Sequence, residues 1–458
     1  MDYAPDPNAW DEAFASGGAP RPEARAALEA LARHEPGALT TAVREAIDRA
    51  GIGFGSVDGD GDFHLDPVPR VISAKEWSHL EAGLGQRLRA LNAFLADAHG
   101  ERRIVAAGVM PERVIDTSEN AEPALRGLRV PGDLWVGIAG LDVVRTSEGE
   151  LRVLEDNLTT PSGFAYAVVA RAVTGAQLGI EGAGSPRSLD GLWDTLAWTF
   201  AAAAPEGAGA EPAVIVLTDG PENSAYWEHC QVGERLGIPV ATPAELEVAG
   251  DHLRLDGRDV DVVYRRTDEH HYDSDVGAVL GDPLRAGTLG VINAFGTAIA
   301  DDKLAHAYVE DMVRFYLEEE PLLRSVRTYD LGRPEVLAEA LDRLDELVIK
   351  PRAGYGGIGV VICPHAEGAD VDAVREAVCA DPAAFIAQEL VTLSCHPTVI
   401  GDGIEPRHVD LRPYVFLGPG GEARVLPGGL TRVAFDAGAL VVNSSQNGGV
   451  KDTWVLPA

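Results

Sequence analysis

A glycine-rich segment between two apolar runs constrains the fold of this chain more than any other feature of its sequence. Gly354, Gly356 and Gly359 fit the spacing G-x-G-x-x-G, but the residues at 358–362 are mostly β-branched. A dinucleotide site would need a helix to begin at these glycines, so the pattern instead predicts a strand–loop–strand hairpin. Lys350 ends the preceding apolar run, and such a loop can lie over a triphosphate with a lysine beside it. A plain turn is the alternative; the P-loop pattern G-x-x-x-x-G-K-S/T does not occur.

A second segment combines two short strands with oxygen-bearing side chains. Residues 140–145 and 151–157 have the pattern of a hairpin. Because side chains alternate along a strand, Glu155 and Asn157 point to the same face, and Asp142 lies on the neighbouring strand. Hard oxygen donors of this kind suit Mg²⁺, which completes its shell with waters and substrate phosphates. The segment therefore predicts a magnesium site, with a solvated surface hairpin as the alternative.

Further strand-like segments lie near the end of the sequence. Residues 385–391 form a short apolar strand that can serve as the linker against which an adenine lies. Arg412 and Arg432 each sit on a strand-like segment. A guanidinium keeps its proton and grips phosphate or carboxylate in a fixed fork. Two of them beside a triphosphate would stabilise a phosphoryl group during its transfer.

The order of these segments resembles that of the ATP-grasp ligases, in particular the ribosomal-protein glutamate ligases. Those proteins run through a strand Lys-Pro, a Gly-rich loop, a Gln-Glu linker, Asp-x-Arg, a second Arg and Asn…Gly-Gly, and end on the metal ligands, Glu-x-Asn…Pro-x-Gly. Here every block is present, but the metal blocks come first, at residues 140–163. The chain is therefore similar to the circularly permuted ATP-grasp family over roughly residues 60–458. The resemblance implies an α/β (α+β) fold, in which a permuted ATP-grasp lobe carries an additional α/β subdomain of the pre-ATP-grasp kind.

The resemblance also implies an activity and a set of site residues. The activity is ADP-forming carboxylate–amine ligation through an acyl phosphate, with ATP and Mg²⁺ as cofactors and small-molecule or peptide acids and amines as substrates. Arg412 and Arg432 would be catalytic, and the metal ligands would be Asp142, Glu155 and Asn157. The ATP contacts would be Lys303, Lys350, Gly354, Tyr355, Gly356, Gly357, Ile358, Gly359, Gln388, Glu389 and Val391. The substrate contacts would be Ser162, Arg265, Arg266, Asn443 and Ser444.

Two other functions fit the same residues. One is a nucleotide-binding scaffold or regulatory protein, although a non-catalytic descendant has no physical reason to keep every metal ligand and lysine. The other is an ATP-dependent phosphotransferase, whose phosphorylated species is the product. Cys395 next to His396 is interpreted as a packed thiol rather than a nucleophile, because neighbours on an extended segment point to opposite faces.

The charge of the chain limits its partners. Its 458 residues include 72 acidic and 38 basic ones, a net charge of −34, which opposes binding to nucleic acid or an anionic membrane. The first residues lack the basic and apolar pattern of a signal peptide, and no apolar run approaches the roughly 20 residues of a membrane span. Four scattered cysteines without metal spacing predict reduced thiols and a cytoplasmic location. The sequence does not indicate an oligomeric state.

Linker segments rich in Gly, Pro or small residues, together with the spacing of apolar residues, divide the chain into parts. The predicted parts are an N-terminal extension (1–60), a permuted C-terminal part of the ATP-grasp lobe with the metal ligands (61–200), an α/β substrate subdomain (201–300) and a nucleotide-binding lobe (301–458). Ser73 is predicted to cap a long helix whose apolar face carries Trp77, Leu80, Leu84, Leu88, Leu91 and Leu95. Single helical stretches are also predicted near residues 23–49 and at 304–317.

Overall fold

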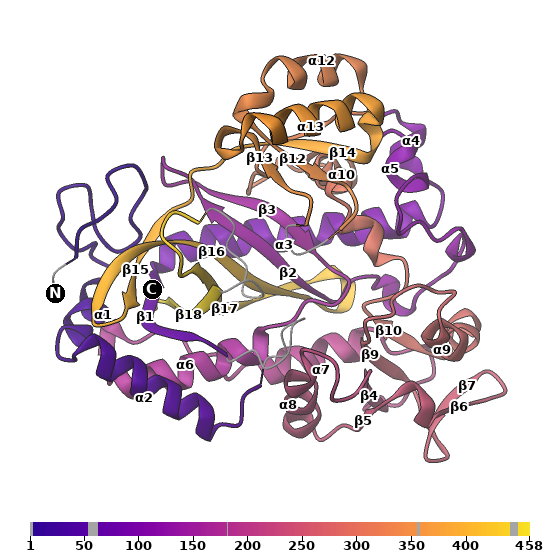
Figure 1. Ribbon diagram of the computed structural model, residues 1–458. Helices are drawn as coiled ribbons and strands as arrows, with labels where there is room; N and C mark the ends of the chain where they lie inside the picture. The colour runs from indigo at the N-terminus through magenta and orange to yellow at the C-terminus, as the bar shows by residue number, and fades with distance from the viewer. Residues whose placement is uncertain (1–2, 54–62, 181, 355–357, 440–447) are drawn as a thin grey trace.

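A seven-stranded sheet forms the centre of the computed structural model, which describes residues 3–53, 63–180, 182–354, 358–439 and 448–458 (Figure 1). The strands follow the order β1-β18-β17-β16-β2-β3, and β15 pairs with β16. Only β1 and β18 run parallel, and the other pairs are antiparallel. Strands that precede residue 160 and strands that follow residue 390 thus share one sheet, as expected for a permuted ATP-grasp lobe. They are β1 (Leu65–Ile72), β2 (Ile138–Arg145), β3 (Leu151–Asn157), β15 (Cys395–Ile400), β16 (Gly403–Leu417), β17 (Ala423–Ala434) and β18 (Gly448–Val455).

Helix α3 (Ala74–Ala98) crosses one face of this sheet, against β16 and β17 (Figure 1). The Ser73 side chain accepts the Glu76 N–H at 3.3 Å, which confirms the predicted cap. All six residues of the predicted apolar face are buried, and burial of each stabilises the fold by about 1.5–3 kcal/mol. Short helices α4 (Arg103–Ala106) and α5 (Arg113–Asp116) follow.

The other face of the sheet is covered by α6 (Phe164–Leu178), which contacts β17 and β18, and by α2 (Pro36–Arg49) packed against α6. Helix α1 (Arg25–Leu31) precedes α2. The prediction of one helical stretch at 23–49 is wrong because Pro36 starts a second helix, where its missing N–H costs nothing.

A smaller α/β unit lies at the lower right of Figure 1. Its parallel sheet has the order β10-β9-β4-β5, and α8 connects β4 to β5 as the sequence predicted. A separate antiparallel sheet, β6-β7-β8, adjoins it. The elements are α7 (Leu192–Ala202), β4 (Val214–Thr218), α8 (Tyr226–Leu236), β5 (Val240–Ala241), β6 (Leu246–Ala249), β7 (His252–Leu255), β8 (Arg258–Val260), β9 (Val262–Arg266), α9 (Asp275–Ala286) and β10 (Gly290–Ile292).

A fourth sheet, with the order β11-β14-β12-β13, stands at the top of Figure 1 with two helices over it. The predicted helix at 304–317 is wrong as one element. It consists of α10 (Lys303–His306), α11 (Val309–Met312) and a π-helical turn (Val313–Leu317), so the 3.6-residue pattern is interrupted twice. The other elements are β11 (Thr328–Asp330), α12 (Pro334–Asp342), β12 (Leu347–Pro351), β13 (Val361–Ile362), α13 (Gly368–Ala380) and β14 (Phe385–Glu389).

The segment before α1 is fixed to the central sheet by buried charge. Glu12 is 5% exposed and accepts hydrogen bonds from Arg70 at 2.5 Å, Arg145 at 2.9 Å and Ser394 at 2.6 Å. Although burial opposes ionisation, Arg145 and Arg70 lower the pKa of Glu12 to about 2. Removal of this carboxylate would leave the buried Arg70 guanidinium without its counter-charge and Arg145 with Glu76 as its carboxylate partner. Among the helices of the described residues, none has the length and apolarity to cross a membrane.

Candidate functional site

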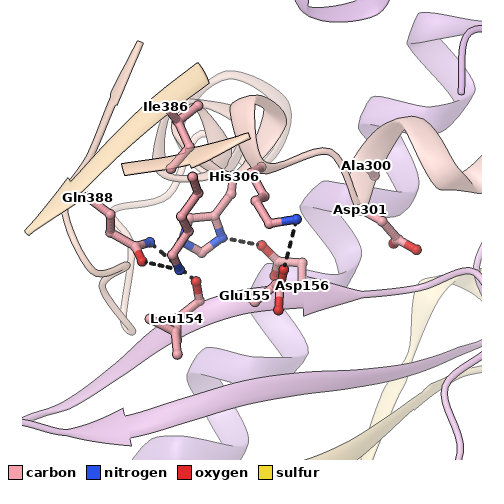
Figure 2. A pocket seen from close by; sticks show the side chains of 10 residues that line it. Leu154, Glu155, Asp156, Ala300, Asp301, His306, Ile386 and Gln388 are labelled. Atoms are coloured by element: carbon pink, nitrogen blue, oxygen red, sulfur yellow. Dashed lines mark hydrogen bonds and ion pairs between the residues drawn. The ribbon is translucent and has the colours of Figure 1, made fainter. Parts of the chain in front are cut away.

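A cleft lies between the β2–β3 hairpin and the upper sheet (Figure 2). Strand β3 forms its floor, the segment that leads into α10 forms one wall, and β12 and β14 form the other. Five of its ten lining residues are Asp, Glu or Lys, which favours a charged ligand rather than an apolar one. The lining residues are Leu154, Glu155, Asp156, Ala300, Asp301, Lys303, His306, Lys350, Ile386 and Gln388.

Lys350 projects into this cleft from β12. Its Nζ donates to Oε1 of Gln388 at 2.7 Å. No carboxylate of the described residues lies within ion-pair distance of it. Burial and the neighbouring Lys303 lower the pKa of Lys350, and Glu155 offsets this only in part. A desolvated cation without a counter-ion is costly, so this lysine is poised for an anionic ligand.

Lys303, the first residue of α10, approaches the hairpin from the opposite wall. Its Nζ donates to the Gly354 carbonyl at 2.6 Å and lies 3.6 Å from Glu155 Oε1. The same end of the glycine-rich loop is anchored by Arg352, which donates to Asp302 at 2.8 Å. The start of the loop therefore sits over the cleft, and β12 and β13 pair as the predicted hairpin.

The other predicted ATP contacts are distributed as follows. Gln388 faces the cleft, whereas Glu389 points to the other side of β14 and pairs with Arg343 at 3.2 Å. Val391 packs against a small apolar cluster. Ile358 is 68% exposed, and Gly359 has φ = +74°, which favours glycine. Tyr355, Gly356 and Gly357 lie outside the described residues.

The predicted metal ligands lie on β2 and β3. Asp142 and Glu155 are direct cross-strand partners, and Asn157 lies two residues further along β3. Glu155 and Asn157 offer hard oxygens that fit Mg²⁺, and the buried Nδ2 of Asn157 has no partner among the described residues. Asp142 is instead held by arginines in this structure: it accepts from Arg412 at 2.7 and 2.8 Å and from Arg432 at 2.8 Å. Although burial opposes ionisation, Arg412 and Arg432 lower the pKa of Asp142.

These two arginines line a second pocket, beside Asp142. Arg432 is held by Asp410 as well, at 2.9 Å, so both guanidiniums have fixed orientations. Tyr414 donates its hydroxyl to the Ser162 carbonyl at 3.0 Å. The lining residues are Phe63, His64, Ser162, Gly163, Tyr166, Arg412, Tyr414, Leu430, Arg432, Gly448, Gly449 and Val450. Asn443 and Ser444 lie outside the described residues.

Arg265 and Arg266 do not line either pocket and are buried within β9. Arg265 donates to the Asn293 carbonyl at 3.2 and 3.3 Å, and burial lowers its pKa to about 10. Arg266 donates to the Pro161 carbonyl at 2.9 Å, so it supports the loop that carries Ser162. Their contact with a substrate stays a prediction.

Two acidic residues that line the cleft, Asp156 and Asp301, were not predicted from the sequence. Asp156 accepts from Arg87 at 2.6 and 2.7 Å and contacts His306 at 2.7 Å. Asp301 accepts the N–H groups of Leu158 and Thr159 at 2.7 and 3.0 Å, and burial raises its pKa to about 7. Strand alternation gave one usable signal, because Asp156 between Glu155 and Asn157 must face the opposite side.

Comparison with known proteins identifies the family. A family model described as circularly permuted ATP-grasp type 2 matches residues 69–434. The chain belongs to this family.

The relatives extend the match over nearly the whole chain. A protein of Frankia casuarinae named "Putative glutamate--cysteine ligase 2-2" is 46% identical and matches 98% of this chain and 54% of its own length. The chain thus spans about half the length of that relative. An uncharacterised protein of Synechocystis is 39% identical over 98% of this chain and 97% of its own. A solved structure, a glutathione synthetase-like effector of Globodera pallida, shares the fold with a TM-score of 0.62 at 13% identity, covering 92% of this chain and 98% of the effector.

Proposed function

We propose that the protein is an ATP-dependent carboxylate–amine ligase that forms ADP and works through an acyl phosphate. The observation that carries this proposal is the presence of two charged pockets beside one hairpin. The lysine-lined cleft contains Glu155, and Asn157 lies two residues further along β3, so this region suits Mg-ATP. The pocket with Arg412 and Arg432 suits a carboxylate. Asp142 joins the two, since it contacts both arginines and pairs with Glu155 across the strands.

Each pocket has a separate task in this reaction. Lys303 and Lys350 bind the phosphates, while Glu155 and Asn157 hold Mg²⁺. The metal, when bound, neutralises charge on the transferring phosphoryl group. Arg412 and Arg432 orient the substrate carboxylate, whose oxygen attacks the terminal phosphorus so that ADP leaves. An amine then attacks the acyl carbon, phosphate departs and the nitrogen loses a proton to give the amide.

Amino acids are the proposed substrate class. The Frankia relative's printed name pairs glutamate with cysteine, and we propose an amino acid or peptide carboxylate as the acid and an amino acid or peptide amine as its partner. All four cysteines are free, as expected for a reducing compartment, and the cytoplasmic location stays a prediction.

The test is ADP formation from Mg-ATP with pooled amino acids and short peptides, followed by mass spectrometry. A ligase releases ADP only when acid and amine are both present and yields a product lighter than their sum by one water. ADP with the acid alone and a stable phosphorylated product would identify a phosphotransferase. Nucleotide binding without turnover across the pool would identify a scaffold.

A further inference from the structure

His306 differs from the other lining residues of the cleft because one nitrogen of its ring has no hydrogen-bond partner among the described residues. It is 4% exposed and lies on α10, one turn after Lys303. Its Nδ1 lies 2.7 Å from Asp156 Oδ2, and its buried Nε2 has no partner among the described residues. Buried polar atoms in folded proteins nearly always have a partner, so an unpaired one on a cleft wall indicates a ligand contact.

The ring is held in one orientation by residues that are themselves fixed. Asp156 receives both arms of the Arg87 guanidinium, at 2.6 and 2.7 Å, and Arg87 also donates to Ser325 at 2.9 Å. Nδ1 also lies 3.1 Å from Nη2 of Arg87, so it donates to Asp156 in one tautomer and accepts from Arg87 in the other, and both contacts hold the same edge of the ring. Figure 2 shows the ring beneath Ile386 with one nitrogen directed to Asp156. Nε2 is therefore the atom left for the cleft.

The surroundings of the ring favour an anionic ligand atom. Lys303 and Lys350 line the same cleft, and Lys350 has no carboxylate within ion-pair distance among the described residues. The charge of Asp156 is already matched by Arg87. An additional phosphoryl oxygen in this cleft would meet the two lysines and the free ring nitrogen together.

We propose that His306 is a phosphate-binding residue of the nucleotide site. Its Nε2–H donates to a phosphoryl oxygen of the nucleotide, and Asp156 and Arg87 are positioning residues that hold the Nδ1 edge of the ring. This inference rests on the proposed function, since it requires the cleft to hold the nucleotide.

The test measures binding of Mg-ADP by calorimetry, and of adenosine by ligand-observed NMR, to the full chain and its variants. His306→Asn keeps an amide near the Nδ1 position, and so the Asp156 contact, but places no atom at Nε2. We expect it to weaken Mg-ADP binding about ten-fold or more and to leave adenosine binding unchanged. His306→Gln places an amide N–H near the Nε2 position and should recover part of the Mg-ADP affinity.

A matched control is His99, a buried histidine whose Nε2 is already bonded to the Gly296 carbonyl at 3.1 Å. His99→Gln should lower the melting temperature and leave Mg-ADP affinity as in the wild type. Equal loss of ADP and adenosine binding in His306→Asn would overturn the phosphate assignment, and so would unchanged ADP binding in both His306 variants. A wild-type protein that binds no nucleotide would overturn the proposed function together with the role of His306. A wild type that binds Mg-ADP, with His306 variants that bind it equally well, would overturn the role of His306 alone.

Discussion

Substitution of Lys350 by Met should separate a ligand-binding lysine from a structural one. The side chain is nearly isosteric, and the lost charge has no carboxylate partner within ion-pair distance among the described residues. A charge-assisted hydrogen bond to phosphate contributes about 1.5–3 kcal/mol, so the Kd for Mg-ATP should rise roughly 10- to 150-fold. Because burial lowers the pKa of Lys350, its charge opposes folding at neutral pH, and the variant without ligand should melt at the wild-type temperature or above.

Lys451 is the matched control for this experiment. It is 0% exposed on β18, but it pairs with Asp66 and donates to the Pro397 carbonyl at 3.0 Å. Lys451→Met leaves Asp66 unpaired and should lower the free energy of unfolding by about 3–5 kcal/mol, with Mg-ATP affinity unchanged. Thermal melts with and without Mg-ATP read both effects. A Lys350→Met variant that melts lower while keeping its full ATP-induced shift would refute the reasoning.

Three other substitutions or treatments test separate parts of the structure. Glu155→Gln or Asn157→Ala should abolish ADP formation with the far-UV circular dichroism and melting temperature unchanged, and normal turnover by either variant would refute their metal role. The pKa of Glu12 falls from 4.5 to about 2 on folding, so its contribution, about 3 kcal/mol, is complete above pH 4.5 and is lost as the pH falls through 2. Accordingly, Glu12→Gln should lower the urea midpoint at pH 7 and much less at pH 3. Burial raises the pKa of Cys395 to about 12, and mass spectrometry should find this thiol unmodified after iodoacetamide treatment of the folded protein.

Helix capping and the spacing of apolar residues predicted those elements whose structure depends only on residues within one short segment. The Ser73 cap and the leucine stripe of α3 are satisfied within one helix, and the β2–β3 hairpin follows from alternation within one short segment. The single helix predicted at 304–317 is wrong because the backbone leaves the 3.6-residue periodicity between α10 and α11 and again at the π-helical turn, and the apolar pattern carries no signal for these breaks.

The partners of the charged side chains could not be predicted from the sequence, because they lie on strands that are far apart in the chain. Asp142, Glu155 and Asn157 look alike as oxygen donors, yet only Asp142 meets the guanidiniums of β16 and β17. The pair Arg265 and Arg266 reads as a polar strand end, but β9 is an interior strand of its sheet, so both side chains are buried. Which member of a charged set is paired depends on strand order, and strand order is a property of the whole fold.

The bond between Asp142 and Arg412 also has a consequence for synthesis of the chain. The two residues are 270 positions apart. At a translation rate of roughly 5–20 residues per second, the acidic hairpin leaves the ribosome on the order of tens of seconds before its arginines exist. During that interval β2 lacks its neighbour β16, because β16 is made later. The central sheet is therefore completed late, when β16 pairs with β2. Until then the exposed edge of β2 can pair with another chain.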